Sequence, residues 1–173
     1  MLVSTFTLGD LYLGINILLV REINRSLEYT PVPGAHEYIR GMLNIRGRVI
    51  TLFDLRSRLS WSEEADTPPA IRATKNNSRR KQYNVIMKTH HEVEKINRDL
   101  AMTKCPWEDP VGLVVDQLGD VRDVVDDTIL PPPANLGGIS ADFVQGVVEF
   151  ERNLLIILDV ASVLGVSQHQ QSS

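Results

Sequence analysis

The chain has 173 residues, 43% hydrophobic and 23% charged, which is the length and composition of one globular domain. Its single cysteine, Cys105, excludes an intrachain disulfide, a CxxC redox pair and a cysteine-based zinc site, and favours the reducing cytoplasm. The net charge of -4 is unevenly distributed, because residues 111–173 carry nine acidic residues against two arginines. An acidic final third is a poor match for nucleic acid and suits charged protein partners better.

The first twenty residues are apolar in patches but lack the pattern of a signal peptide. Gly9, Asp10 and Gly14 interrupt them, and the first basic residue is Arg21, whereas a signal peptide begins with positive charge. The longest apolar runs elsewhere are far shorter than the ~20 residues that cross a bilayer. We therefore expect a cytoplasmic chain that does not span the membrane.

Short apolar segments of β type, separated by turn residues, recur along the chain. Several of them, such as VITLF and LLIIL, are apolar at nearly every position, which is typical of strands covered on both faces. The pattern predicts a mainly β protein. The predicted strands are Phe6–Leu8, Leu11–Ile15, Val49–Leu55, Asn84–Thr89, Val111–Val115, Val144–Phe150 and Leu154–Val160.

Two short helices and one inserted loop complete the prediction. Apolar residues at 20, 23 and 27, followed by two prolines, predict a helix over Val20–Leu27. Residues 91–104 predict an amphipathic helix with Val93, Ile96 and Leu100 on its apolar face. Residues 61–82 are polar with a proline pair, which predicts an exposed loop. Its basic run at 79–81 suggests nucleic acid or anionic lipid, but no aromatic platform accompanies it, so a solvated loop is favoured.

An internal repeat emerges when the chain is shifted against itself by 105 residues. Tyr38 to Ser60 then aligns without a gap on Phe143 to Gly165, with four identities, including Gly41 with Gly146. Both copies follow a proline cluster and share the order of an aromatic-apolar pair, glycine, apolar strand, charged turn and apolar strand. The repeat predicts two similar β halves packed face to face.

Three blocks, in this order, resemble the CheW-like domain family, the adaptor module of bacterial chemotaxis: PVPGAHEYIRGMLNIRGRVITLFDLRSRLS, PVGLVVDQLGDVRDVVDDTILPPP and DFVQGVVEFERNLLIILDVASVL. The resemblance covers residues 5–165. It implies two five-stranded SH3-like β-barrel subdomains with short helices, in one domain over residues 1–166 followed by a polar tail, 167–173. The stretches 61–82 and 91–108 fall where the family usually has short turns, which favours a specialised paralogue.

The resemblance also implies a function. The family couples the cytoplasmic tip of methyl-accepting chemoreceptors to the regulatory domain of a CheA-type histidine kinase, at membrane-associated receptor clusters. It does so by protein–protein binding, without catalysis. The chain contains no kinase, receiver or phosphotransfer region, so the resemblance implies the adaptor and not the kinase itself.

Arg46 and Gly47 are the first candidates for partner contact. An arginine between a strand end and a glycine points outward, and its planar guanidinium can bind carboxylates or backbone carbonyls of a partner. On the residues alone, a solvated Arg46 or an internal ion pair with Glu22 is an equal alternative. The similarity of this segment to the family's NLRG motif favours partner contact.

Further positions in VREI and DQLGDV match those that line the family's receptor or kinase surfaces. They add Val20, Glu22, Leu118 and Val121 to the predicted protein-binding set. By composition alone, such apolar residues lie more often in a core.

Four residues of the repeat are predicted to be structural. Gly41 and Gly146 are assigned to structural turns, and Gly41, like Gly47, is interpreted as a glycine that allows a tight turn or positive φ. Asp54 and Asp159 end equivalent apolar strands and are assigned to capping or turn bonding.

The chemistry-bearing residues do not indicate an enzyme. His90 and His91, with Glu92 and Glu94, suggest a metal site, but adjacent histidines on a strand face opposite ways. We find no nucleophile–base pair, glycine-rich phosphate loop or metal cluster, and expect no cofactor. The alternative to an adaptor is a small β-barrel module that binds a ligand or nucleic acid, which would require the basic residues of 72–81 to bind an oligonucleotide.

Replacing residues 61–82 by a short Gly/Ser turn should leave the free energy of unfolding nearly unchanged, because the cost of closing a loop varies slowly with its length. Thermal and urea melts of the shortened protein and its parent measure this. A loss of cooperative unfolding would contradict the loop assignment. A change in partner choice without loss of folding would make the segment a specificity element.

Overall fold

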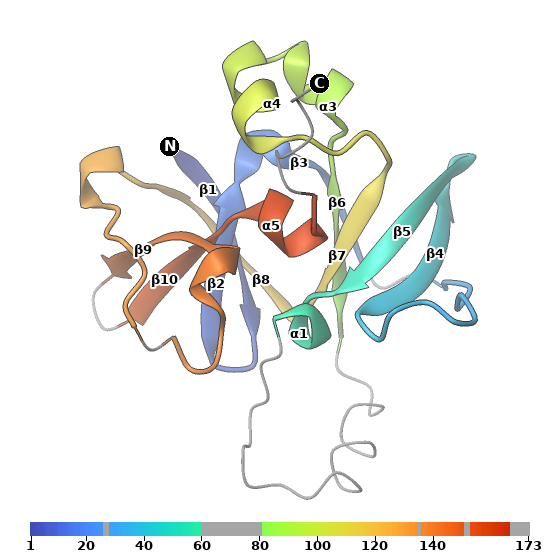
Figure 1. The fold of residues 1–173 in the computed structure, drawn as a ribbon, viewed down its shortest axis with the longest axis horizontal. Coiled ribbons are helices and arrows are strands. Elements are labelled where there is room, and N and C mark those ends of the chain that lie inside the picture. The colour runs from blue at the N-terminus through green and yellow to red at the C-terminus, as the bar shows by residue number, and fades with distance from the viewer. Residues whose placement is uncertain (26–27, 60–80, 135, 151–152, 167–173) are drawn as a thin grey trace, which may run out of the picture.

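The computed structural model describes residues 1–25, 28–59, 81–134, 136–150 and 153–166. Two five-stranded β-sheets with short helices around them form the molecule (Figure 1), which confirms the predicted fold class. The strands are β1 (Leu2–Leu8), β2 (Leu11–Asn16), β3 (Val20–Arg25), β4 (Ile39–Ile45), β5 (Arg48–Asp54), β6 (Tyr83–Met87), β7 (Val111–Val115), β8 (Gln117–Asp123), β9 (Val144–Phe150) and β10 (Asn153–Leu158). The helices are α1 (Leu55–Arg58), α3 (His90–Glu94), α4 (Arg98–Lys104) and α5 (Val160–Leu164), with single 3₁₀ turns η1 (Ile17–Leu19), η2 (Asp126–Thr128) and η3 (Ala141–Phe143).

The two halves of the chain exchange strands. One sheet has the order β8-β1-β2-β10-β9 and the other β3-β6-β7-β5-β4, so each sheet combines strands from both halves. One parallel pair in each sheet, β2 with β10 and β5 with β7, joins the two halves. The remaining neighbours pair antiparallel. Neither half therefore completes a sheet by itself.

The repeat extends into the packing of the core. Leu43, Ile50 and Leu52 belong to a small apolar cluster in the second sheet, and the residues 105 positions later belong to the matching cluster in the first. Those later residues are Val148, Leu155 and Ile157. Successive side chains of a strand point to opposite faces of the sheet. The residues that alternate with the members of these two clusters therefore face the other side of each sheet. Each sheet therefore has an apolar cluster of its own on one face.

A larger apolar cluster joins the two sheets. It contains Phe6 and Leu13 from one sheet and Val85 and Leu113 from the other, all with 0% exposure. Burying each such side chain contributes about 1.5–3 kcal/mol to stability. This shared core explains why β-type segments are apolar on both faces.

The two copies of the repeat meet at Arg58. Its guanidinium carbon lies 4.6 Å from the ring centroid of Tyr38 and 4.9 Å from that of Phe143, which are equivalent residues of the repeat. Its Nε donates to the carbonyl of Val163, the residue that aligns with Arg58 itself. A single arginine thus links equivalent elements by cation–π contact and hydrogen bonding.

Asp54 and Asp159 cap helices, as the sequence predicts. Asp54 Oδ1 accepts from the backbone N–H of Ser57 at 3.2 Å at the start of α1. Asp159 Oδ1 accepts from Ser162 at the same distance at the start of α5. Each carboxylate satisfies one of the free N–H groups of a first helical turn.

Gly41 and Gly146 lie inside β4 and β9, so their assignment to turns is wrong, whereas the positive φ predicted for Gly41 and Gly47 is observed. Another segment of backbone crosses each of them. A Cβ on Gly41 would lie 2.5 Å from the carbonyl oxygen of Thr30, and one on Gly146 would lie 2.9 Å from that of Leu130. Each crossing segment forms a β-bridge with the residue after the glycine. Close approach of backbone is the reason for glycine in both copies.

The helix predicted over Val20–Leu27 is also wrong. Val20–Arg25 forms strand β3, which pairs antiparallel with β6 and alternates between half-buried and exposed residues. The apolar spacing of residues 20 and 23 fits one helical turn, but the hydrogen bonds offered by β6 decide for a strand. Residues 26–27 lie outside the described residues.

Residues 91–104 form two helices, α3 and α4, instead of the single predicted one. The first helix ends at Glu94, and Asn97 begins the second, because its side chain accepts from the backbone N–H of Leu100 at 3.0 Å. Val93 is buried, but Ile96 is 56% exposed. The predicted polar loop, apart from residues 81 and 82, and the tail 167–173 lie outside the described residues.

Gly146→Ala should lower the free energy of unfolding by about 1–3 kcal/mol, because the added methyl group would overlap the crossing segment. The matched control is Gln145→Ala on the exposed position before it, which should change stability by no more than about 0.5 kcal/mol. Urea melts of both variants measure the difference. Equal melts would show that the crossing segment moves aside at no cost.

Candidate docking site

The connection between β4 and β5 is a two-residue turn with unusual backbone angles. Arg46 has φ 52° and Gly47 has φ 82°, and Arg46 is the only non-glycine residue in the described ranges with positive φ. Asn44 Oδ1 accepts from the N–H of Gly47 at 2.9 Å. Two consecutive positive φ values define the turn that suits the twist of a hairpin, for which Asn-Gly is the favoured pair. Arginine at this position is therefore not explained by the turn.

The side chain of Arg46 is 77% exposed and lies 3.5 Å from Glu22 Oε2. Glu22 is more buried and also accepts, through Oε1, from Asn24 Nδ2 at 2.9 Å. A long, exposed ion pair of this kind contributes at most about 1 kcal/mol. Both alternatives for Arg46 therefore hold in part: it pairs with Glu22, and most of its surface still faces solvent.

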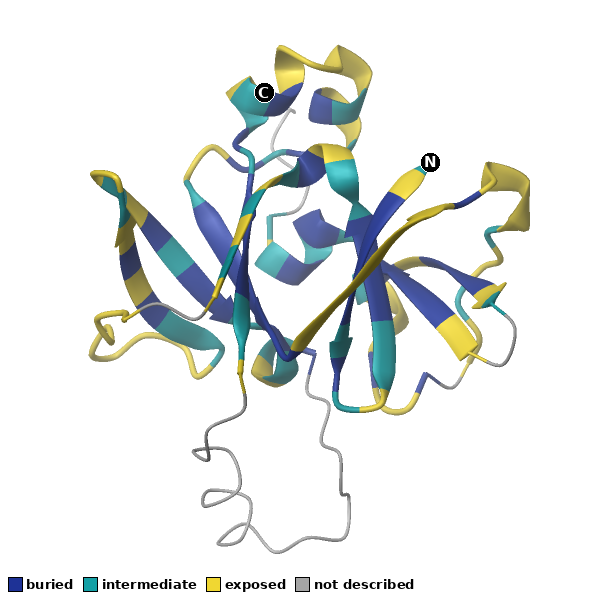
Figure 2. Ribbon diagram, turned by 180° about the vertical axis from the view of Figure 1, so that it is seen from behind, coloured by how far each residue is buried: buried dark blue, intermediate teal, exposed yellow. Residues whose placement is uncertain are grey.

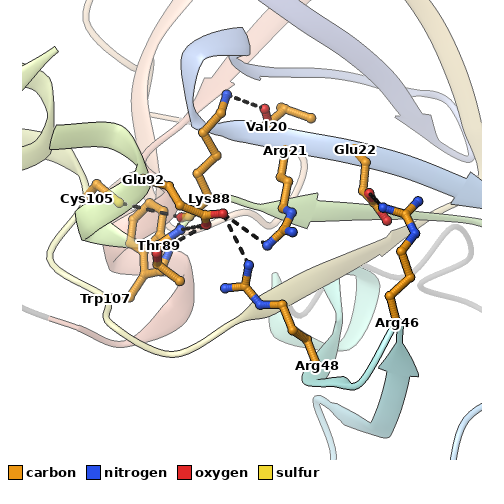
Figure 3. A network of polar contacts seen from close by, with 10 residues as sticks. All are labelled: Val20, Arg21, Glu22, Arg46, Arg48, Lys88, Thr89, Glu92, Cys105 and Trp107. Atoms are coloured by element: carbon orange, nitrogen blue, oxygen red, sulfur yellow. Dashed lines mark hydrogen bonds and ion pairs between the residues drawn. The ribbon is translucent and has the colours of Figure 1, made fainter. Parts of the chain in front are cut away.

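Val20 lies beside this pair, at the start of β3. It is half-buried, and its carbonyl accepts from Lys88 Nζ at 2.7 Å. The Lys88 amine also donates to the carbonyl of Leu18. Partial burial lowers the pKa of Lys88, an effect that the carboxylate of Glu92 opposes. Val20, Glu22 and Arg46 thus come together in one region (Figure 3), and Gly47 follows Arg46 in the turn.

Leu118 and Val121 belong to the other sheet, on its edge strand β8. Every residue of β8 is exposed, with Leu118 at 39% and Val121 at 50%. Among the described strands, β8 pairs only with β1. Strands β3 and β8 both face the viewer in Figure 2. The predicted residues therefore divide between the two sheets, with Leu118 and Val121 on one and the group around Arg46 on the other.

The sequence analysis missed a third component of this region, centred on Glu92. Its Oε1 lies 3.0 Å from Arg21 Nη1 and 3.2 Å from Arg48 Nη1 (Figure 3). Its Oε2 accepts from the backbone N–H of Thr89 at 2.9 Å, which completes a capping box at α3. The spacing of Thr89 and Glu92 was a visible signal for the capping box. No sequence pattern indicated the two arginines as its partners.

Behind this network lies a buried cluster. Trp107 Nε1 donates to the carbonyl of Lys88 at 2.7 Å, and Cys105 Sγ lies 3.7 Å from the same oxygen. Cys105 is fully buried, and burial, followed by the charges of Glu108 and Glu92, raises the pKa of its thiol to about 12. A thiol in this state is not a nucleophile near neutral pH.

The histidines do not form a metal site in the described ranges. The sequence analysis placed His90 and His91 on a strand. In the structure they begin helix α3. His90 Nδ1 donates to the carbonyl of Cys105 at 2.8 Å, the only role that a carbonyl partner allows. Nowhere in the described ranges do three His, Cys, Asp or Glu side chains gather closely enough to hold a metal ion.

The exchanged sheets carry charged and apolar side chains on exposed edges and turns, where the binding residues of many proteins lie. Residues 3–168 match the family described as CheW-like domain. The chain belongs to this family and is a chemotaxis adaptor. Among its described helices, none is long and apolar enough to cross a membrane.

Curated relatives agree with this assignment. The probable chemotaxis protein CheW of Rhizobium etli is 26% identical over 165 residues, covering 95% of this chain and 88% of its own. The chemotaxis protein CheW of Rhizobium meliloti is 28% identical over 158 residues, covering 91% and 83%. The crystal structure of the scaffolding protein TtCheW from Thermoanaerobacter tengcongensis matches with a TM-score of 0.68 at 22% identity, over 94% of this chain and 86% of that one. This structural likeness supports the fold.

Cys105 should resist a thiol reagent in the folded protein at about pH 8 and react fully once the protein is unfolded, because the thiolate is the reactive form. Its raised pKa also has a consequence for stability. The unfolded chain loses the thiol proton first, so stability should fall as pH rises from 9.0, the usual value, toward about 12.

Cys105→Ala is the control for the second effect, since it removes the titrating group and should flatten this part of the pH profile. Melts of both proteins across the alkaline range measure it. Rapid labelling of the native parent would show that the thiol is accessible and would contradict the burial of Cys105.

Proposed function

We propose that this adaptor couples the cytoplasmic tip of methyl-accepting chemoreceptors to the regulatory domain of a CheA-type histidine kinase. It acts by binding both and holding them in a fixed geometry, with no catalytic group and no cofactor. Its place of action is the cytoplasm, at receptor clusters. Family membership and the names of the curated relatives support the chemotaxis setting.

Arg46 carries the argument for a docking surface. A non-glycine residue at positive φ costs about 1 kcal/mol or more, and such strain is concentrated at functional positions. The turn itself would be better served by asparagine. The ion pair with Glu22 is too exposed to offset the cost. An outward guanidinium with free donors is suited to bind a carboxylate or carbonyl of a partner.

A coupling protein needs a second surface, and β8 is our candidate. Leu118 and Val121 are exposed apolar side chains on a strand whose outer edge has no partner strand among the described residues. Apolar anchors surrounded by charge are typical of protein interfaces. Asp120 and Asp123 on the same strand supply that charge. We assign Val20, Glu22, Arg46 and Gly47 to one docking surface and Leu118 and Val121 to the other.

The second half of the repeat gives a further reason. Arg46 and Gly47 align on Glu151 and Arg152, so the Arg-Gly pair occurs in one copy only, whereas Gly41 and Gly146 occur in both. A residue required by the fold should recur in both copies. A residue that serves one docking surface need not recur.

Arg46→Ala and Arg46→Glu should each weaken binding of the kinase or the receptor by about 1–3 kcal/mol, as expected for a charged interface anchor. Thermal stability should change little, because the side chain is exposed. Titration calorimetry with the purified kinase regulatory domain and with a receptor cytoplasmic fragment measures both affinities.

Arg98→Ala, an exposed arginine on α4, is the control for loss of a surface charge and should bind like the parent. An Arg46→Ala protein that binds both partners as tightly as the parent would remove this surface from the proposal. One that unfolds at a much lower temperature would instead make Arg46 a structural residue.

A further inference from the structure

Side chains connect β3, one edge of the second sheet, to the β4–β5 turn that contains Arg46 and Gly47. In the order β3-β6-β7-β5-β4, strand β3 lies at one edge, and the β4–β5 turn lies at the other. No backbone pairing between described strands joins these edges. The pair of Glu22 with Arg46 spans them, and so does Glu92, which contacts Arg21 of β3 and Arg48 of β5 (Figure 3).

Glu92 is well placed for this because its own position is fixed. One carboxylate oxygen, Oε2, accepts from the N–H of Thr89 at 2.9 Å and from its hydroxyl at 3.1 Å. The other, Oε1, faces both arginines. The carboxylate is only 28% exposed, which strengthens its charge-assisted contacts. Through Glu92 the inserted segment of the chain therefore reaches the two arginines of the docking region.

The charges of this region determine the kind of partner that fits. Three arginines, at 21, 46 and 48, face two carboxylates, Glu22 and Glu92, which leaves one net positive charge among these five side chains. Arg21 and Arg48 remain 32% and 38% exposed. Each guanidinium has five N–H donors, of which the contact with Glu92 uses those of one nitrogen. The surface is complementary to an acidic segment.

We propose that Glu92 is a positioning residue, which holds Arg21 and Arg48 beside Arg46 so that the three arginines together bind an acidic segment of the docked protein. The inference rests on the proposed function and gives the inserted residues a role in it. Long side chains held in place before binding lose less conformational freedom when the partner arrives.

Glu92→Gln tests this role with little change to the helix, because glutamine also completes a capping box. Removing the charge should weaken binding of the kinase domain or the receptor fragment about three- to tenfold, the ordering cost of a long side chain. Nitrogen relaxation of the arginine Nε–H groups provides a readout without a partner: Arg21 and Arg48 should become more mobile, and Arg98 should not. Glu94→Gln, an exposed neighbour on the same helix, should alter neither measurement.

Looser arginines together with weaker binding would support the inference. Arginines as ordered as in the parent would overturn the positioning role, whatever the affinity. Looser arginines with unchanged affinity would overturn their part in docking. A parent protein that binds neither partner would overturn the proposed function itself, a result distinct from any effect of the variant.

Discussion

Exchange of strands between the two halves of the chain is the constraint on which the rest of the structure depends. The parallel pairs β2–β10 and β5–β7 each join a strand of one half to a strand of the other. Because neither half completes a sheet alone, the two sheets form together and share the apolar cluster between them. This interdependence predicts that the duplicated sequence folds as one unit instead of two separable modules.

Polar contacts reinforce the exchange where the halves meet. Arg56 on α1 lies 2.5 Å from Asp116, which also accepts from the N–H of Gly9 at 2.9 Å. Asp116 is almost fully buried, so these partners are needed to satisfy its charge. Arg58 stands between the equivalent rings of Tyr38 and Phe143. One side chain of the first copy therefore serves as a contact for both copies.

In each sheet one edge strand, β3 or β8, has no further described strand beside it, whereas a crossing segment bridges the other edge strand, β4 or β9. In the second sheet, side chains connect β3 to the β4–β5 hairpin: Glu22 of β3 contacts Arg46 in the turn, and Glu92 contacts Arg21 of β3 and Arg48 of β5. Such side-chain contacts can be changed one residue at a time without loss of the backbone hydrogen bonds between strands. A docking surface built from them can therefore differ between related adaptors while the sheets stay the same.

The sequence by itself determined the β class, the repeat and the family, because strand composition, the recurring Gly41/Gly146 pattern and the motif order are local features. It also placed Arg46 in an exposed turn. Only the tertiary structure decided that Val20–Arg25 is a strand, since the pairing with β6 overrides a helical spacing. The same holds for Glu92, whose arginine partners lie 44 and 71 residues away in sequence and meet it only because the fold brings β3 and the start of β5 to α3.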